Sequence, residues 1–216
     1  MTTSSSFFQK VYSGLNHLYI CAILQALFVL GFVLGLGIFG LGPSFVTTME
    51  VAKEYHQHKL TKPLRVYLEK YKKNFVLANK VFLPQCIVFA FIEVDKQINF
   101  GWSGEVQGIF LSILVITQFL LFISMMTSGA LLTSYWLRPL EAIKKSMPFI
   151  FYNIGGMLLI ILWTGICYYG SLLLPGLIPF FSFGLWIVVI EGMYLRLFEN
   201  NEERMMESQK EQAIAK

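Results

Sequence analysis

The chain has 216 residues, of which 56% are hydrophobic and only 14% are charged. Soluble domains carry about 25% charged residues, so this composition excludes an ordinary water-soluble domain. The net charge of +4 is concentrated in one connection, which indicates membrane orientation and not nucleic-acid binding. The length predicts a single membrane domain over residues 1–216.

Apolar segments predict an all-α membrane protein with five transmembrane helices. A helix needs about 20 mostly apolar residues to cross roughly 30 Å of hydrocarbon. Residues 149–190 contain no charged side chain and are long enough for two crossings, divided near Pro175 because proline interrupts a helix. The predicted spans are residues 18–39, 75–92, 108–132, 149–170 and 176–196.

Lysine and arginine in the connections predict the orientation. The connection between the first two spans is strongly basic, the next connection is mostly acidic, and the third again carries basic residues, among them Arg138 and Lys144. Because basic connections stay in the cytoplasm, we expect the N-terminus outside and the C-terminus inside a bacterial plasma membrane. The polar tail, residues 199–216, is predicted to continue the last helix into the cytoplasm.

Residues 44–74 form a cytoplasmic segment that is too long for a simple turn. Apolar residues recur at helical spacing on both sides of Pro63, which predicts two amphipathic helices. Such helices pack under the bundle, lie in the headgroup layer, or receive a partner subunit. The residues predicted for partner docking are Tyr67, Lys70, Tyr71, Lys72 and Lys73.

A weak internal similarity is also visible. Lys62-Pro63-Leu64 precedes the second span, as Arg138-Pro139-Leu140 precedes the fourth. This pattern predicts that spans one and two and spans three and four are parallel repeats of two helices, with the fifth span added.

Polar side chains inside the spans are the candidates for an intramembrane site. Glu191 lies deep in an apolar run, and Gln118 and Asn153 lie in the third and fourth spans. Glu191 is read either as a proton or cation site or as a carboxylate paired with a cation such as Arg196. The two amides are read either as ligand contacts or as interhelical hydrogen bonds. The sequence contains no catalytic motif and no metal-ligand spacing, so we expect no catalytic residue, no metal and no cofactor.

One segment is more specific than composition. GLGPSFVTTMEVAKEY (40–55) leads through a basic stretch to YKKNFVLANKVFLP (71–84). We expect Gly40 and Gly42 to bend the chain and Pro43 to begin the next helix, with Asn74 and Phe75 at the entry to the second span. This pattern resembles the YesL family of bacterial membrane proteins over nearly the whole chain.

That resemblance implies an accessory function. Members of the YesL family have no assigned activity and occur beside genes for carbohydrate uptake. We therefore expect a non-catalytic membrane protein that associates with permease subunits of a carbohydrate ABC importer. The alternatives are a small transporter or channel that uses Glu191, Gln118 and Asn153, and a scaffold that senses lipid or envelope state through residues 44–74.

Overall fold

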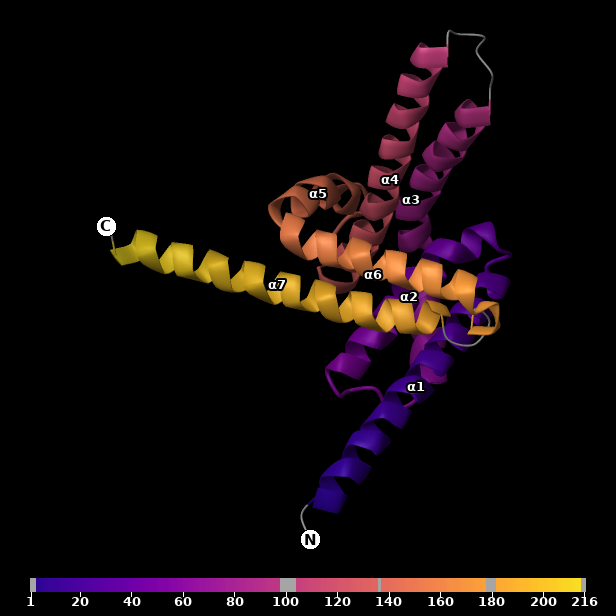
Figure 1. Ribbon diagram of the computed structural model, residues 1–216. Coiled ribbons are helices and arrows are strands. Elements are labelled where there is room, and N and C mark those ends of the chain that lie inside the picture. Colours follow the sequence, from indigo (N-terminus) through magenta and orange to yellow (C-terminus); the bar gives the residue numbers. More distant parts are fainter. Residues whose placement is uncertain (1–2, 98–103, 136, 178–181, 215–216) are drawn as a thin grey trace. The chain divides into compact units, whose positions relative to one another are not determined.

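The chain folds into helices only, within the residues that the structure describes. The structure is a computed structural model, and it describes residues 3–97, 104–135, 137–177 and 182–214. Its elements, in chain order, are α1 (Thr3–Leu34), α2 (Ile38–His56), α3 (Pro63–Gln97), α4 (Gly104–Ser134), α5 (Pro139–Tyr152), α6 (Ile154–Leu173), the short 3₁₀ helix η1 (Pro175–Leu177) and α7 (Phe183–Ile214) (Figure 1). The described residues contain no β-strand.

These helices form two compact units, each assembled from separate parts of the sequence. The first unit contains Met1–Leu30, Thr48–Leu68 and Asn153–Lys216, and the second contains Gly31–Thr47 and Glu69–Tyr152. A single membrane domain was predicted for the whole chain. The chain passes several times from one unit to the other, and some helices, such as α3, contribute to both, so the single domain stays a prediction.

Within the described ranges, four helices are long and apolar enough to cross a membrane, which fits a multi-pass membrane protein. They comprise Gly14–Leu34, Pro63–Gln97, Gln107–Ser134 and Ile154–Leu173. Each corresponds to one of the first four predicted spans, although the fourth begins at residue 154 and not at 149. The chain turns at Asn153, so residues 149–152 end α5 instead.

The predicted fifth span, 176–196, is not among these four helices. Residues 178–181 of that span lie outside the described residues. The remainder overlaps η1 and the first half of α7. Helix α7 continues without interruption to Ile214, so the helical continuation predicted for the polar tail is confirmed as far as that residue (Figure 1).

The bend after the first span lies earlier than predicted. Helix α1 ends in a hydrogen-bonded turn in which Leu36 N–H donates to the Val33 carbonyl and Gly37 N–H donates to the Phe32 carbonyl. Leu36 has a φ of 56° and Gly37 one of 78°, so both occupy the left-handed region. This pair of hydrogen bonds is a Schellman motif, the usual way for a helix to satisfy its last carbonyls before the chain turns.

Gly40, Gly42 and Pro43 lie inside α2 and do not make the bend, so the prediction for these residues was wrong. The glycines serve close packing instead. A side chain at Gly40 would meet the Phe32 carbonyl oxygen at 2.5 Å, and one at Gly42 would meet Cβ of Phe82 at 2.8 Å. Pro43 is the sixth residue of α2, beyond the first turn where a proline fits without loss of a hydrogen bond.

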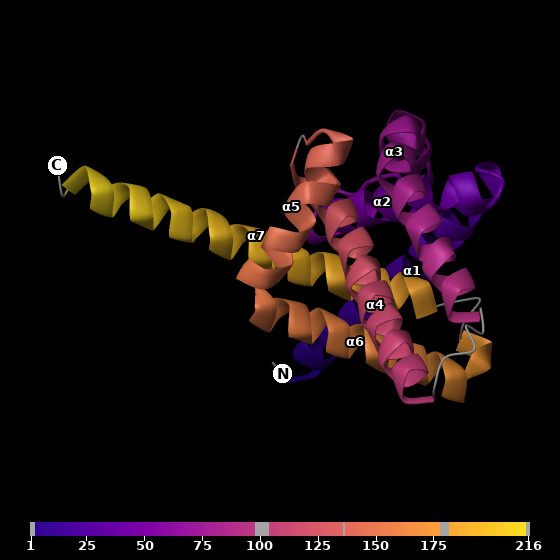
Figure 2. The same ribbon diagram turned by 90° about the horizontal axis from the view of Figure 1, so that it is seen from above.

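A buried polar cluster joins three helices of the second unit. Gln85 on α3 donates to the Ser128 hydroxyl of α4 over 3.2 Å, and the Ser124 hydroxyl of α4 donates to Oε1 of Gln85 over 3.4 Å. Ser124 also shares a 2.7 Å hydrogen bond with Ser146 of α5. All four side chains are buried. Helices α4 and α5 lie side by side (Figure 2).

We expect Gln85→Leu to weaken the second unit. The substitution removes the amide that both Ser124 and Ser128 use, and interhelical hydrogen bonds in membranes contribute about 1–2 kcal/mol. Thermal unfolding of the purified protein in detergent measures the loss. Ser112→Ala is the matched control, because the exposed Ser112 bonds only to the Gly108 carbonyl of its own helix. Equal unfolding temperatures for Gln85→Leu and the unmodified protein would contradict the role assigned to this cluster.

Candidate functional site

The N-terminus of α7 is held by a side chain from the first predicted span. Oε1 of Gln25, on α1, accepts hydrogen bonds from the backbone N–H groups of Phe183 at 2.9 Å and Gly184 at 3.1 Å. The first four N–H groups of a helix have no partner within that helix, so this buried amide satisfies two of them. Phe28 stacks on Phe183, with 3.7 Å between the ring centroids. Gln25 therefore fixes where α7 begins.

Small residues let the neighbouring helices approach α7 closely. A Cβ atom added to Gly184 would overlap the backbone carbonyl of Cys21 on α1, and one added to Gly156 on α6 would overlap the side chain of Leu197. Trp186 adds a directional contact, because its indole N–H donates to the Thr164 hydroxyl of α6 over 3.1 Å. Helix α7 is thus packed between α1 and α6 within the first unit.

Glu191 lies on the packed part of α7 and is completely buried. Neither of its carboxyl oxygens has a hydrogen-bond partner within the described ranges. Two charged side chains of α2 act on it electrostatically: Lys53 favours a negative charge on Glu191, and Glu50 opposes one. An ionised carboxyl group without hydrogen bonds is expensive to bury, so this arrangement contributes little to folding.

The cation near Glu191 differs from the one predicted. Arg196 was the expected partner, but it is exposed and lies five residues further along the same helix. Five residues correspond to about 500° of rotation at 3.6 residues per turn, so the two side chains leave α7 on different sides. Lys53 comes from a helix more than a hundred residues away in the sequence, and no local pattern indicates it.

A cavity of about 550 Å³ lies beside the same part of α7. His17, Cys21, His56, Gly192, Arg196 and Glu199 are among the residues that line it. Nε2 of His56 donates to the Val188 carbonyl over 2.8 Å, and the absence of a side chain at Gly192 leaves room for the His56 ring. His17 shares a hydrogen bond with the Tyr55 hydroxyl, whose pKa is raised first by burial and then by the nearby Cys21 thiol. Tyr55 therefore stays neutral at physiological pH.

The other two residues of the predicted intramembrane site have separate surroundings. Gln118 belongs to the second unit, where its amide donates to Glu93 over 2.9 Å, and Glu93 also pairs with Lys96 at 2.6 Å. Asn153 belongs to the first unit and stands before the first turn of α6, where its backbone carbonyl accepts from Met157. Gln118 therefore makes an interhelical hydrogen bond, one of the two alternatives predicted for it, because Glu93 lies on α3 and Gln118 on α4.

The predicted docking surface is largely buried. Tyr67 is 0% exposed and Tyr71 only 6% exposed, and the Tyr71 hydroxyl donates to the Gly31 carbonyl at the end of α1 over 2.7 Å. Residues 42–49 of α2 are buried on every side. Of the five predicted docking residues, Lys72 and Lys73 are exposed and Lys70 is half-buried. The two tyrosines are covered by the chain itself, and the docking face over residues 67–73 stays a prediction that the structure does not test.

The two remaining motif residues have ordinary places in α3. Asn74 is buried, and Phe75 is half-buried with its ring 5.8 Å from that of Tyr71. The hydroxyl of Tyr71 contacts the backbone near the end of α1, just before the chain turns. An aromatic residue at an amphipathic position carries no signal for such a bond, and only the fold reveals it.

These observations define a helical protein of multi-pass membrane character whose last helix buries one acidic side chain near a lysine. Residues 21–96 match a family described as a protein of unknown function, DUF624. The match covers less than half of the chain, from within α1 to the end of α3, and includes Glu50 and Lys53 but not Glu191. No curated protein and no solved structure matches the chain. The resemblance to the YesL family stays a prediction.

Proposed function

We propose that the chain crosses a bacterial plasma membrane five times, with the N-terminus outside and the C-terminus in the cytoplasm. The first half of α7, together with the segment before it, makes the fifth crossing. Its contacts with α1 and α6, two helices that are apolar enough to span a membrane, support this placement. The alternation of basic connections supports the orientation. The parallel repeat is supported by Pro63 and Pro139, which begin α3 and α5.

In this membrane we propose a non-catalytic accessory protein that associates with the permease subunits of a carbohydrate ABC importer. The docking role is supported by the exposure of the C-terminal half of α7. Phe198 is the last buried residue of this helix up to residue 210, and residues 202–210 are all exposed. A helix in water without a packed face is held by little more than its intrinsic propensity, so a partner that covers it would stabilise it.

The chemistry of this helix favours a protein partner over the membrane surface. Residues 199–216 carry five acidic and three basic side chains, so the helix is repelled by anionic headgroups. Met205 and Met206 are 56% and 54% exposed. Exposed methionines adapt well to the apolar surface of another protein. The partner surface is therefore expected to combine an apolar groove with basic residues.

Co-purification tests the proposal. We expect the protein, expressed at its native level and extracted in a mild detergent, to retain importer permease subunits identified by mass spectrometry. Met205→Ala together with Met206→Ala should reduce their recovery at least tenfold. The control is Asn200→Ala together with Ser208→Ala, because both residues are exposed and uncharged, so the acidic charge of the helix is unchanged. Equal recovery with both double variants would reject α7 as the docking element, and recovery of no permease subunit would reject the importer association.

A second candidate function, a small transporter or channel, is favoured by Glu191. A completely buried acid without hydrogen bonds is the kind of residue that marks a proton or cation path. Reconstituted protein should then move a solute or protons across liposomes, and Glu191→Gln should stop this movement while the Met205 and Met206 variants leave it unchanged. Under the accessory function, the purified protein is inert in the same liposomes.

The third reading, a scaffold that senses lipid through residues 44–74, loses its support. It requires an amphipathic face free to enter the headgroup layer. The α2 part of this segment is buried through residues 42–49, and Tyr67 and Tyr71 on α3 are buried as well. We do not propose this function.

A further inference from the structure

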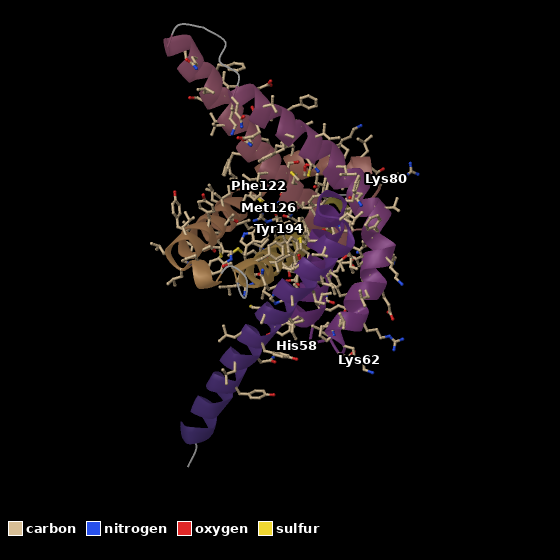
Figure 3. All side chains as sticks on the ribbon, turned by 90° about the vertical axis from the view of Figure 1, so that its right-hand side faces the viewer. His58, Lys62, Lys80, Phe122, Met126 and Tyr194 are labelled. Atoms are coloured by element: carbon tan, nitrogen blue, oxygen red, sulfur yellow. The ribbon has the colours of Figure 1, made fainter. Side chains whose placement is uncertain are left out.

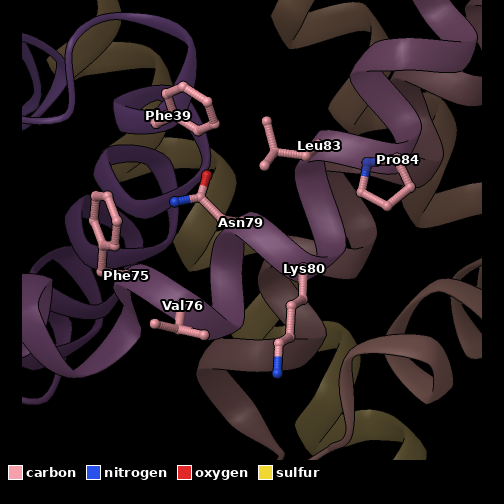
Figure 4. A pocket seen from close by; sticks show the side chains of 7 residues that line it. All are labelled: Phe39, Phe75, Val76, Asn79, Lys80, Leu83 and Pro84. Atoms are coloured by element: carbon pink, nitrogen blue, oxygen red, sulfur yellow. The ribbon is translucent and has the colours of Figure 1, made fainter.

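A groove on the second unit combines an apolar floor with a cationic edge. It is lined by Phe39 of α2 and by residues of α3, namely Phe75, Val76, Asn79, Lys80, Leu83 and Pro84, and it encloses about 480 Å³ (Figure 4). This volume falls in the range of small-ligand sites, about 300–1,000 Å³. Phe39 and Val76 remain 53% and 60% exposed. The groove therefore has a large apolar surface, which no other described part of the unit covers.

A buried amide inside the groove lacks a partner. Asn79 is only 8% exposed, and its Oδ1 atom accepts no hydrogen bond in the part of the chain that the structure describes. Figure 4 shows its amide directed toward Phe39, across the groove. A buried amide oxygen without a donor is costly, so a ligand group that donates a hydrogen bond here would bind more tightly.

Lys80 supplies the positive charge. Its exposed side chain points away from the helix bundle (Figure 3), and its methylene stem lines the groove. Lys80 lies five residues inside the predicted span 75–92, about 8 Å along the helix. A lysine at this depth extends its ammonium group back to the level of the lipid phosphates. An anionic phosphate at the mouth of the groove matches this charge.

We propose that this groove binds one anionic phospholipid with a hydroxyl-bearing headgroup, such as a phosphatidylglycerol, taken from the cytoplasmic leaflet. One acyl chain occupies the apolar floor between Phe39 and Leu83, the phosphate contacts Lys80, and a glycerol hydroxyl donates to Asn79. A bilayer lipid is the occupant because the groove lies along a helix of the membrane, where lipid replaces water as the surrounding solvent. The proposal is independent of the partner of α7.

Lipid binding to the purified full-length protein tests the groove. Native mass spectrometry measures the lipid retained from membranes, and thermal unfolding in detergent is titrated with short-chain phosphatidylglycerol, short-chain phosphatidylcholine or soluble glycerol phosphate. We expect phosphatidylglycerol to stabilise the protein at concentrations at least tenfold below those of phosphatidylcholine. Lys80→Gln should remove this preference, and Val76→Trp should weaken the binding of both lipids because the indole fills the apolar floor. Both positions are exposed, so both variants should fold.

Lys72→Gln is the matched control, because Lys72 is an exposed lysine on the same helix that does not line the groove. Equal loss of the phosphatidylglycerol preference in Lys72→Gln and Lys80→Gln would show a diffuse charge effect and overturn the proposal. Unchanged lipid binding by Val76→Trp would overturn it as well. Stabilisation by glycerol phosphate alone, as strong as that by the lipid, would show an anion site without an acyl chain and would also reject it.

Discussion

Replacing Gly184 by alanine is expected to disrupt the first unit. The new Cβ atom would overlap the carbonyl oxygen and carbon of Cys21, which are backbone atoms of α1 and cannot turn away as a side chain does. The helices can relieve this overlap only by moving apart. That movement breaks both hydrogen bonds from Gln25 and separates Phe28 from Phe183. We expect a loss of about 4 kcal/mol or more, the range of the most damaging single substitutions.

Fluorescence-detected size exclusion and thermal unfolding in detergent measure this loss. Gly165→Ala is the control, since a Cβ atom at Gly165 in the middle of α6 meets nothing within 4 Å. Alanine in a helix is favoured over glycine by about 0.5–1 kcal/mol, so the control should unfold at the same or a slightly higher temperature. A Gly184→Ala protein that elutes as a single peak and unfolds within a degree of the unmodified chain would refute the close approach of α1 and α7.

Glu191→Met is expected to stabilise the protein, whereas Gly184→Ala is expected to destabilise it. Glu191 is 0% exposed and its carboxyl oxygens have no hydrogen-bond partner among the described residues. Methionine fills a similar volume and removes the cost of burying a charge. Replacing buried ionic groups by apolar ones of similar size often stabilises by about 1–4 kcal/mol. Thermal unfolding at constant detergent concentration measures the change.

Gln25→Met provides the comparison, because Gln25 is also a buried polar residue but is fully used by two backbone N–H groups. It should destabilise the protein by about 1–3 kcal/mol, since both N–H groups of α7 lose their acceptor. If Glu191→Met stabilises the protein and Gln25→Met destabilises it, Glu191 is retained for activity and Gln25 for structure. Destabilisation by Glu191→Met to the same degree as Gln25→Met would make Glu191 a structural residue and remove the support for the transport function.

The sequence contains enough information to locate the helices but not their long-range partners. Hydrophobic segments long enough to cross a bilayer predicted four helices that the structure contains, because crossing length is a local property. Proline marked the beginning of α3 for a similarly local reason. The bend after α1 was misplaced because five glycines lie between residues 31 and 42, and the turn places a leucine in the left-handed conformation where a glycine is usual.

In the candidate site, too, the sequence predicts local features but not long-range partners. Burial of Glu191 followed from its position in an apolar run, whereas its neighbours Lys53 and Glu50 lie on a helix that the sequence assigned to a cytoplasmic surface. Tyr67 and Tyr71 have the amphipathic spacing of an exposed helix, and tertiary packing buries them. A pattern of apolar spacing predicts that a face is covered. It does not predict whether lipid, another protein or the same chain covers it.

The interleaving of the two units has a consequence for biosynthesis. The Gln25 amide and the two backbone N–H groups of α7 that donate to it are 158 and 159 residues apart, and the first unit needs segments from both ends of the chain. At a synthesis rate of about 5–20 residues per second, the ribosome takes roughly 8–32 s to reach α7 after Gln25 has emerged. During this interval α1 must wait in the translocon or the bilayer with an unsatisfied amide. A chain truncated before α7 would lack the two N–H groups that donate to Gln25 and a large part of the first unit.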